Sequence, residues 1–198
     1  MSLDLIAAFV VFAVATLFTP GPNNIMLMTS GLNFGFARTL PHAFGVALGF
    51  GFLVLMVGLG LGAAFAAYPQ AYTVLKFAAA AYLLYLAWVI ANAGPARGGG
   101  GSRPLSFLQG AAFQWVNPKG WVMAVGAVTA YAAVAAFPLN VVVLAAIFTA
   151  LGTLSSWTWM LFGTSLRPVV TDPRKVRVFN IVMAVLLVAS LVPVFVEA

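Results

Sequence analysis

The sequence predicts an all-α integral membrane protein with six transmembrane helices. Of its 198 residues, 64% are hydrophobic and only 6% are charged, whereas soluble domains are usually about 45–50% apolar and about 25% charged. A small soluble core cannot bury such an excess of apolar residues. A spanning helix needs about 20 apolar residues, so the chain has room for about six spans. We therefore expect one transmembrane domain over residues 1–198, surrounded by the lipid bilayer.

Short polar or Gly- and Pro-containing connections separate six apolar segments. The expected spans cover residues 3–29, 40–67, 71–91, 107–133, 140–166 and 176–196. The first segment begins with an acidic residue, Asp4, rather than a basic region, so we expect a retained first helix and not a cleaved signal peptide. Small-xxx-small spacings, which allow close helix packing, occur at Gly45 and Gly49 and at Gly58 and Gly62.

The basic residues of the connections predict the orientation. They fall in alternate connections, which places them on one side of the membrane; they are Arg38, Arg97, Arg103, Arg167, Arg174, Lys175 and Arg177. The connections around residues 68–70 and 137–139 hold no charge. Because positive connections stay in the cytoplasm, we expect both termini to be periplasmic.

Two related halves, about 1–93 and 107–198, are indicated by matching features. Pro20 interrupts the first span and Pro118 the fourth, 98 residues later. Lys76 and Arg177, near the starts of spans three and six, are 101 residues apart. Because each half has an odd number of spans, the second must enter from the opposite face. The sequence thus predicts an inverted 3+3 repeat with broken helices 1 and 4, an architecture of transporters.

The first break, Thr-Pro-Gly-Pro-Asn-Asn at residues 19–24, is a candidate binding site. Two prolines and a glycine interrupt a helix, and in lipid such a break persists only where protein or water satisfies the freed groups. Pro22 can begin the next half-helix, whose amide end attracts an anion such as a carboxylate. Asn23 and Asn24 add neutral donors and acceptors. The alternative is a structural kink whose Asn side chains bond neighbouring helices.

The second break supplies the other candidates. Gln114 and Asn117 are three residues apart and share a helix face. Lys119 lies near mid-membrane, where a charge costs at least about 2.5–3.5 kcal/mol. It could pair with a substrate carboxylate or change its protonation state. The alternative is a Lys that bonds carbonyls freed by Pro118.

Two further residues have weaker signals. Ser156 lies in a polar-aromatic stretch of span five and is a weak pocket candidate. His42, the only histidine, could couple transport to protons, although an interfacial side chain without a transport role is the favoured reading. The three acids all lie near the termini or in a connection. Coupling candidates are therefore Lys119 and His42.

Several function classes are excluded or disfavoured by composition. There is no cysteine, and one histidine with three acids provides no cluster for a metal site. We therefore expect no cofactor, no metal and no enzymatic activity. The net charge of +6 comes from basic residues in connections, which sets orientation rather than indicating nucleic acid as a partner.

Three motifs together resemble the LysE/RhtB family of bacterial amino-acid exporters. They are residues 19–24, Leu75-Lys76 with Ala81-Tyr82-Leu83 and Leu86-Ala87, and Asn117-Pro118-Lys119. Within the family, the chain looks most similar to the cysteine/O-acetylserine efflux branch, through residues 113–119, Gly152-Thr153, residues 179–182 and Leu186-Leu187. The resemblance implies proton-driven efflux of small amino acids across the inner membrane. Some members carry an acid in span five where this chain has Ser155 and Ser156, which argues against a cationic substrate.

We therefore expect a secondary transporter in the bacterial inner membrane that exports small neutral amino acids or their derivatives. The half-helix ends near Pro22 and Asn23 would hold the carboxylate with Lys119, while Asn24, Gln114 and Asn117 would orient the other groups. Alternating access would rock one half against the other. The alternative is a non-transporting membrane scaffold or helper subunit. The sequence leaves the amino acid, the coupling ion and a homodimeric state open.

Overall fold

The computed structural model describes residues 2–61, 67, 69–93 and 103–192, and within these it contains helices and no strands. The all-helical class is thereby confirmed. The elements are α1 (Leu3–Phe18), α2 (Pro22–Phe34), α3 (Phe36–Met56), η1 (Val57–Leu61), α5 (Pro69–Ala91), α6 (Phe107–Phe113), η2 (Gln114–Val116), α7 (Pro118–Ala130), η3 (Ala132–Val134), α8 (Leu139–Ser165) and α9 (Pro173–Ala189).

Two helical segments are long and apolar enough to cross a membrane, namely Phe36–Leu61 and Leu139–Ser165. The α1–α2 pair, bent by 54°, passes the same test as one broken span. Among the described residues, therefore, length and composition support two or three spans. The full set of six and its repeat symmetry remain predictions.

The boundary between the first two predicted spans was wrong by several residues. The first span was expected to end at Thr29 and the second to begin at Leu40, but α2 continues to Phe34 and α3 begins at Phe36. Gly35 alone separates the two helices, with φ at 82°, a conformation that glycine adopts readily. Because a single glycine makes this turn, no longer connection is needed.

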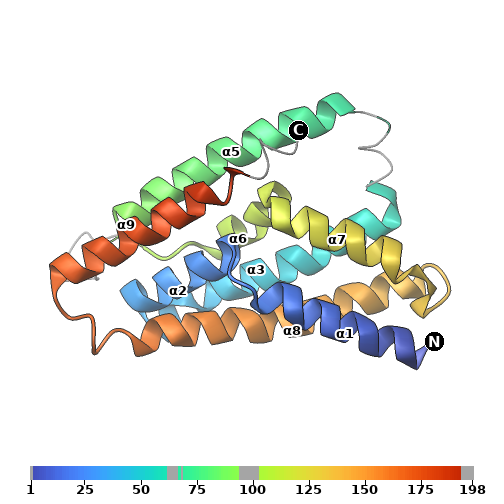
Figure 1. Cartoon of the computed structure of the whole chain (residues 1–198), viewed down its shortest axis with the longest axis horizontal. Coiled ribbons are helices and arrows are strands. Elements are labelled where there is room, and N and C mark those ends of the chain that lie inside the picture. The colour runs from blue at the N-terminus through green and yellow to red at the C-terminus, as the bar shows by residue number, and fades with distance from the viewer. Residues whose placement is uncertain (1, 62–66, 68, 94–102, 193–198) are drawn as a thin grey trace.

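The helices are packed in pairs that join distant parts of the sequence. In Figure 1, α1 and α2 meet at a bend, and α6 and α7 meet at a second break. The closest packing is between α3 and α8, α2 and α8, and α3 and α6, while α5 and α9 lie side by side along one flank. The helices that carry the two breaks are thereby held around α3 and α8.

Glycines allow several of these helices to touch through their backbones. A side chain at Gly163 of α8 would overlap the carbonyl oxygen of Met28, and one at Gly45 of α3 would overlap that of Phe107. A Cβ at Gly49 would lie 2.6 Å from Cα of Ala111. The predicted close approach at Gly45 and Gly49 is thus confirmed, between α3 and α6. Its counterpart at Gly58 faces Val141, whereas Gly62 lies outside the described residues.

A dense aromatic cluster, the α1 aromatic plug, fills the bundle beside the first half of α1. Phe148 lies at its centre, with its ring centroid 4.8 Å from that of Phe9 and 5.0 Å from that of Phe50. Tyr131 packs on Phe9 at 5.2 Å. Edge-to-face contacts of this kind add to the stabilisation from apolar burial. The plug joins α1, α3 and α8 to the end of α7.

Candidate functional site

The two helix breaks have the same construction. α2 begins with Pro22 after Gly21, and α7 begins with Pro118 after Asn117. Proline is favoured at the first helical position because it has no N–H to satisfy there. Neither helix start is capped by a side chain. In the first turn of each half-helix, backbone N–H groups are therefore available to donate hydrogen bonds and carry partial positive charge.

Both breaks open on one central cavity with a volume of about 40 Å³. α3 and α8 complete its wall. The polar lining residues are Thr16, Asn23, Asn24, Asn117, Lys119, Ser155 and Ser156, and the others are Leu17, Gly21, Pro22, Val46, Ala47, Phe50, Gly120, Met123 and Gly152. Six of the seven predicted binding residues thus lie on this cavity; they are Pro22, Asn23, Asn24, Asn117, Lys119 and Ser156.

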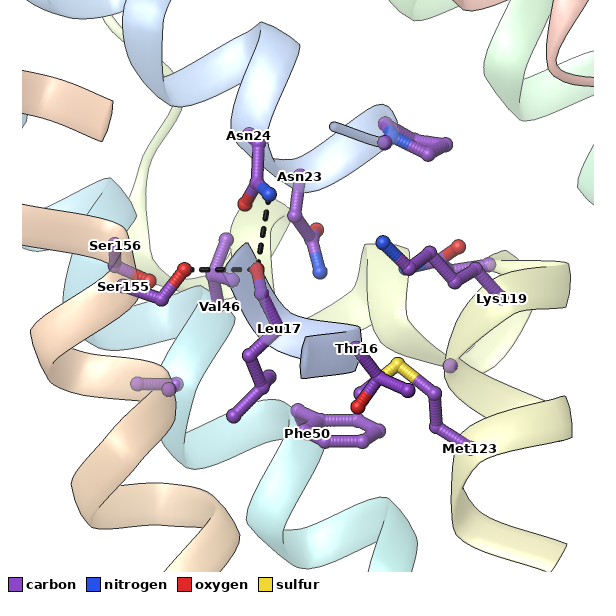
Figure 2. Close-up of a pocket in the computed structure, with 16 residues that line it drawn as sticks. Thr16, Leu17, Asn23, Asn24, Val46, Phe50, Lys119, Met123, Ser155 and Ser156 are labelled. Carbon is purple, nitrogen blue, oxygen red and sulfur yellow. Dashed lines mark hydrogen bonds between the residues drawn. The ribbon is translucent and has the colours of Figure 1, made fainter. Parts of the chain in front are cut away.

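The carbonyl groups released at the end of α1 are satisfied by side chains. Asn24 Nδ2 donates to the carbonyl oxygens of Leu17 at 3.0 Å and Thr19 at 2.9 Å. Ser155 Oγ of α8 donates to the same Leu17 oxygen at 2.8 Å, as Figure 2 shows. A broken helix inside a membrane protein requires such partners. Asn24 and Ser155 therefore stabilise the break.

Lys119 crosses from one predicted half to the other. Its Nζ donates to the carbonyl oxygen of Thr19 at 2.8 Å. A Cβ at Gly21 would lie only 3.0 Å from Cδ of Lys119, so the missing side chain makes room for the lysine. The alternative in which Lys119 bonds carbonyls freed by Pro118 is wrong, because the carbonyl it bonds belongs to the opposite break.

Gln114 is the predicted binding residue that the structure places off the cavity wall. Its Nε2 donates to Asn23 Oδ1 at 2.9 Å, and Asn23 Nδ2 donates to its Oε1 at 2.9 Å. Gln114 Nε2 also donates to the carbonyl oxygen of Gly110 at 3.0 Å. The side chain is fully buried. Gln114 therefore contacts the cavity through Asn23, with which it forms a reciprocal amide pair.

The polar and apolar parts of the cavity wall face one another. Figure 2 shows Asn23, Asn24 and Lys119 on one side and Phe50 and Met123 on the other. Asn117 is 2% exposed, and its Oδ1 has no hydrogen-bond partner among the described residues. Of the described residues on the wall, only Lys119 is ionisable. The cavity therefore offers a cation, helix amides and an unused acceptor beside an apolar surface.

His42 lies away from this cavity. The ring is fully buried between α2, α3 and α6, so it is covered by protein; its expected position at the membrane interface remains a prediction. Its Nδ1 is 3.3 Å from Ser30 Oγ, and its Nε2 has no partner among the described residues. Close approach by the backbone at Gly110, where a Cβ would lie 2.8 Å from the His42 carbonyl oxygen, encloses it.

Several wall residues were not identified as site residues from the sequence. Thr16, Phe50 and Met123 sit in apolar helical stretches and have no local signal that separates them from lipid-facing residues. Ser155 belongs to the polar-aromatic stretch that was singled out, but its bond to the break could not be inferred. The sequence identified Gly21 as a residue that breaks the helix, but it did not show that the missing side chain makes room for Lys119.

Comparison with known proteins gives a consistent result. The family described as LysE type translocator matches residues 14–192. The chain is 32% identical over 197 residues to the cysteine/O-acetylserine efflux proteins of Escherichia coli strain K12 and Shigella sonnei, covering 98% of this chain and 100% of each relative. No solved structure matches. This membrane protein belongs to the LysE type translocator family.

Proposed function

We propose that this protein is a secondary transporter that exports small neutral amino acids or their derivatives across the bacterial inner membrane. The observation that carries the proposal is the convergence of two uncapped half-helix N-termini and Lys119 on one central cavity. Relatives named for cysteine and O-acetylserine efflux support the same substrate class.

A substrate carboxylate would bind where positive charge is concentrated. The amide ends of α2 and α7 carry partial positive charge, and Lys119 adds a full charge between them. A carboxylate would take the place of the Thr19 carbonyl as partner of Lys119 Nζ. The resulting hydrogen bond is assisted by charge on both sides, which makes it stronger than the one it replaces.

The remaining groups of a small amino acid match the other walls. The unused Oδ1 of Asn117 can accept from the ammonium group, because an amide oxygen is an acceptor. Ser156 is a further polar contact on α8. Phe50 and Met123 form an apolar wall for a short side chain. A cationic side chain would meet no carboxylate among the described wall residues, which favours a neutral substrate.

The size of the cavity implies that it must open. One water needs about 10–15 Å³ of such volume, so about 40 Å³ holds a few waters and no amino acid. Alternating access between two open states is the transport mode that fits an inverted repeat of six spans with a closed central site. In this scheme the basic connections lie in the cytoplasm and both termini in the periplasm.

Coupling to protons would use the ionisable groups inside the bundle. Lys119 lies on the cavity, and His42 lies near Ser30, further along α2. These two remain the candidates for the coupling step. The pH dependence of transport therefore forms part of the experiment below.

The experiment is efflux of labelled cysteine, O-acetylserine, alanine and lysine from proteoliposomes, with and without a pH gradient. We expect the neutral compounds to leave faster than from protein-free vesicles, and lysine not to. Lys175→Ala provides a matched control, because Lys175 is an exposed lysine at the start of α9. Absence of transport for every amino acid by correctly inserted protein would contradict the proposal.

A further inference from the structure

One face of α2 runs from the central cavity to a second, smaller cavity. This cavity, of about 20 Å³, lies between α2, α5 and the segment that precedes α6, and Arg103 and Ser30 lie on its wall. Met26, Ser30 and Phe34 of α2 all line it, and residues four apart share a helix face. Asn23 on the central cavity is three residues before Met26, so the same face continues between the two cavities.

The Asn23–Gln114 pair lies at the end of this α2 face that borders the central cavity, beside a buried apolar cluster that includes Met26 and Phe113. The two amides exchange hydrogen bonds of 2.9 Å, and they join α2 to the end of α6. Otherwise α2 and α6 make few contacts with each other. Cross-helix hydrogen bonds inside membrane proteins are individually weak. Separating α2 from α6 at this point breaks this amide pair and the apolar contact of the buried cluster that includes Met26 and Phe113.

The opposite side of the central cavity is closed by the α1 aromatic plug. Phe50 lies on the cavity wall and packs on Phe148 of the α1 aromatic plug. Behind it, Phe9 and Tyr131 continue the plug toward the N-terminus of α1. Opening on that side would expose several large rings at once. On the side of the small cavity, space already exists beside α2, which favours opening there.

We propose that substrate enters the central cavity along this face of α2, by way of the small cavity beside Arg103, and that the Asn23–Gln114 amide pair is the gate. The proposal rests on the proposed export function. Arg103 is exposed and positively charged, so it suits the carboxylate of an arriving amino acid. Ser30 offers a hydroxyl part-way along the route. Opening leaves both amides free to bond the passing substrate.

The absence of native cysteine provides a direct test. Ala47 lines the central cavity, so Ala47→Cys places the chain's only thiol behind the gate. A membrane-impermeant methanethiosulfonate reagent is applied to the Arg103 side in inside-out vesicles, and to the opposite side in right-side-out vesicles. We expect labelling to be faster from the Arg103 side.

Removing one partner of the gate should speed this labelling. In the Ala47→Cys background, Gln114→Ala is expected to raise the rate about tenfold from the Arg103 side and to leave the rate from the other side unchanged. That factor corresponds to about 1.4 kcal/mol, the size expected for losing two such membrane-buried hydrogen bonds. The double variant Asn23→Gln with Gln114→Asn exchanges the two amide side chains, so that one long and one short amide still face each other. This variant should restore slow labelling.

A second reciprocal amide pair supplies the control. Asn33 and Asn180 exchange hydrogen bonds of 2.7 and 3.2 Å between α2 and α9, and neither residue lines the two cavities. Asn180 also donates to the carbonyl oxygen of Ala93 on the wall of the small cavity, so this control shows whether a disturbance of the small cavity alone speeds labelling. Asn180→Ala should leave the Ala47→Cys labelling rate unchanged. Equal acceleration by Asn180→Ala and Gln114→Ala, or no acceleration by Gln114→Ala, would overturn the gate proposal.

The two proposals fail in different ways. Labelling needs no substrate, so gated labelling in a protein that moves no amino acid would overturn the transport function alone. Efflux of neutral amino acids with labelling that ignores Gln114 would overturn the gate alone. A substrate without a thiol, such as O-acetylserine, should protect the Ala47→Cys thiol from labelling only if both proposals are correct.

Discussion

Replacing Lys119 by Met should separate binding from stability. Methionine keeps an unbranched stem of similar length and loses only the charge and the donor. The structure shows one hydrogen bond from Lys119, to Thr19 O at 2.8 Å, and that oxygen also accepts from Asn24. The Thr19 carbonyl oxygen therefore keeps a partner, Asn24, in the variant.

The Lys119→Met variant should bind substrate more weakly but should not be less stable. A hydrogen bond to a charged group contributes about 1.5–3 kcal/mol, so losing the lysine–carboxylate contact should weaken apparent substrate affinity about 10- to 150-fold. At the mid-membrane position predicted from the sequence, removing the charge would relieve a cost of at least about 2.5 kcal/mol on insertion scales. Because Lys119 is only partly buried beside the cavity, we expect only a small part of this stabilisation. The melting temperature should therefore be unchanged or raised.

Two measurements on the same preparations test this prediction. The efflux KM for the best neutral substrate is compared with the melting temperature in detergent, with Lys175→Met as the control that removes an exposed lysine. A KM within about twofold of the parent value, or about 0.4 kcal/mol, would refute a carboxylate role. A lower melting temperature together with lost transport would make Lys119 a structural residue instead.

The close helix contacts and the cavity wall lead to three further predictions. Gly163→Ala should destabilise the protein by several kcal/mol, because its Cβ would overlap the Met28 carbonyl. Gly126→Ala should be neutral or stabilising by up to about 1 kcal/mol, because a Cβ there meets nothing within 4 Å. Thermal stability followed by size-exclusion chromatography measures both variants, and equal effects would contradict the packing. Met123→Ala removes part of the apolar wall and enlarges the cavity, so it should raise leucine efflux relative to alanine efflux. An unchanged ratio of leucine to alanine efflux in competition assays would show that Met123 does not contact the substrate. His42→Gln should leave the ligand-induced thermal shift unchanged, because the ring does not line the central cavity; loss of acceleration by a pH gradient would assign His42 to coupling, and its retention would exclude it.

The sequence was most informative where backbone chemistry is local. The sequence predicted a half-helix start at Pro22 and a break at Pro118, and α2 and α7 begin at these two residues, because the loss of an N–H is a property of one residue. The position of Lys119 deep in the fourth segment was equally readable, because a charge inside an apolar run is rare. These signals identified most polar residues of the central cavity.

What the sequence did not reveal depends on the relation between helices. Gln114 and Asn117 share a helix face, yet Asn117 reaches the cavity wall and Gln114 bonds Asn23 behind it. Phe50 and Met123 resemble the many lipid-facing residues around them, so only packing separates them. The burial of His42 beside Pro41 was not evident either, because the glycine at 110 that encloses it lies on another helix.

The glycine contacts tie helices together across the two halves of the predicted repeat. Gly31 and Gly163 press the backbones of α2 and α8 together, and Gly45, Gly49 and Gly110 do the same for α3 and α6. Helices that touch backbone to backbone cannot slide past each other without losing these contacts. Each pair combines half of a broken helix from one predicted half of the chain with the long helix of the other. Because α3 and α8 also pack on each other, the two pairs meet along these long helices, and each break is tied to the long helix of the opposite predicted half.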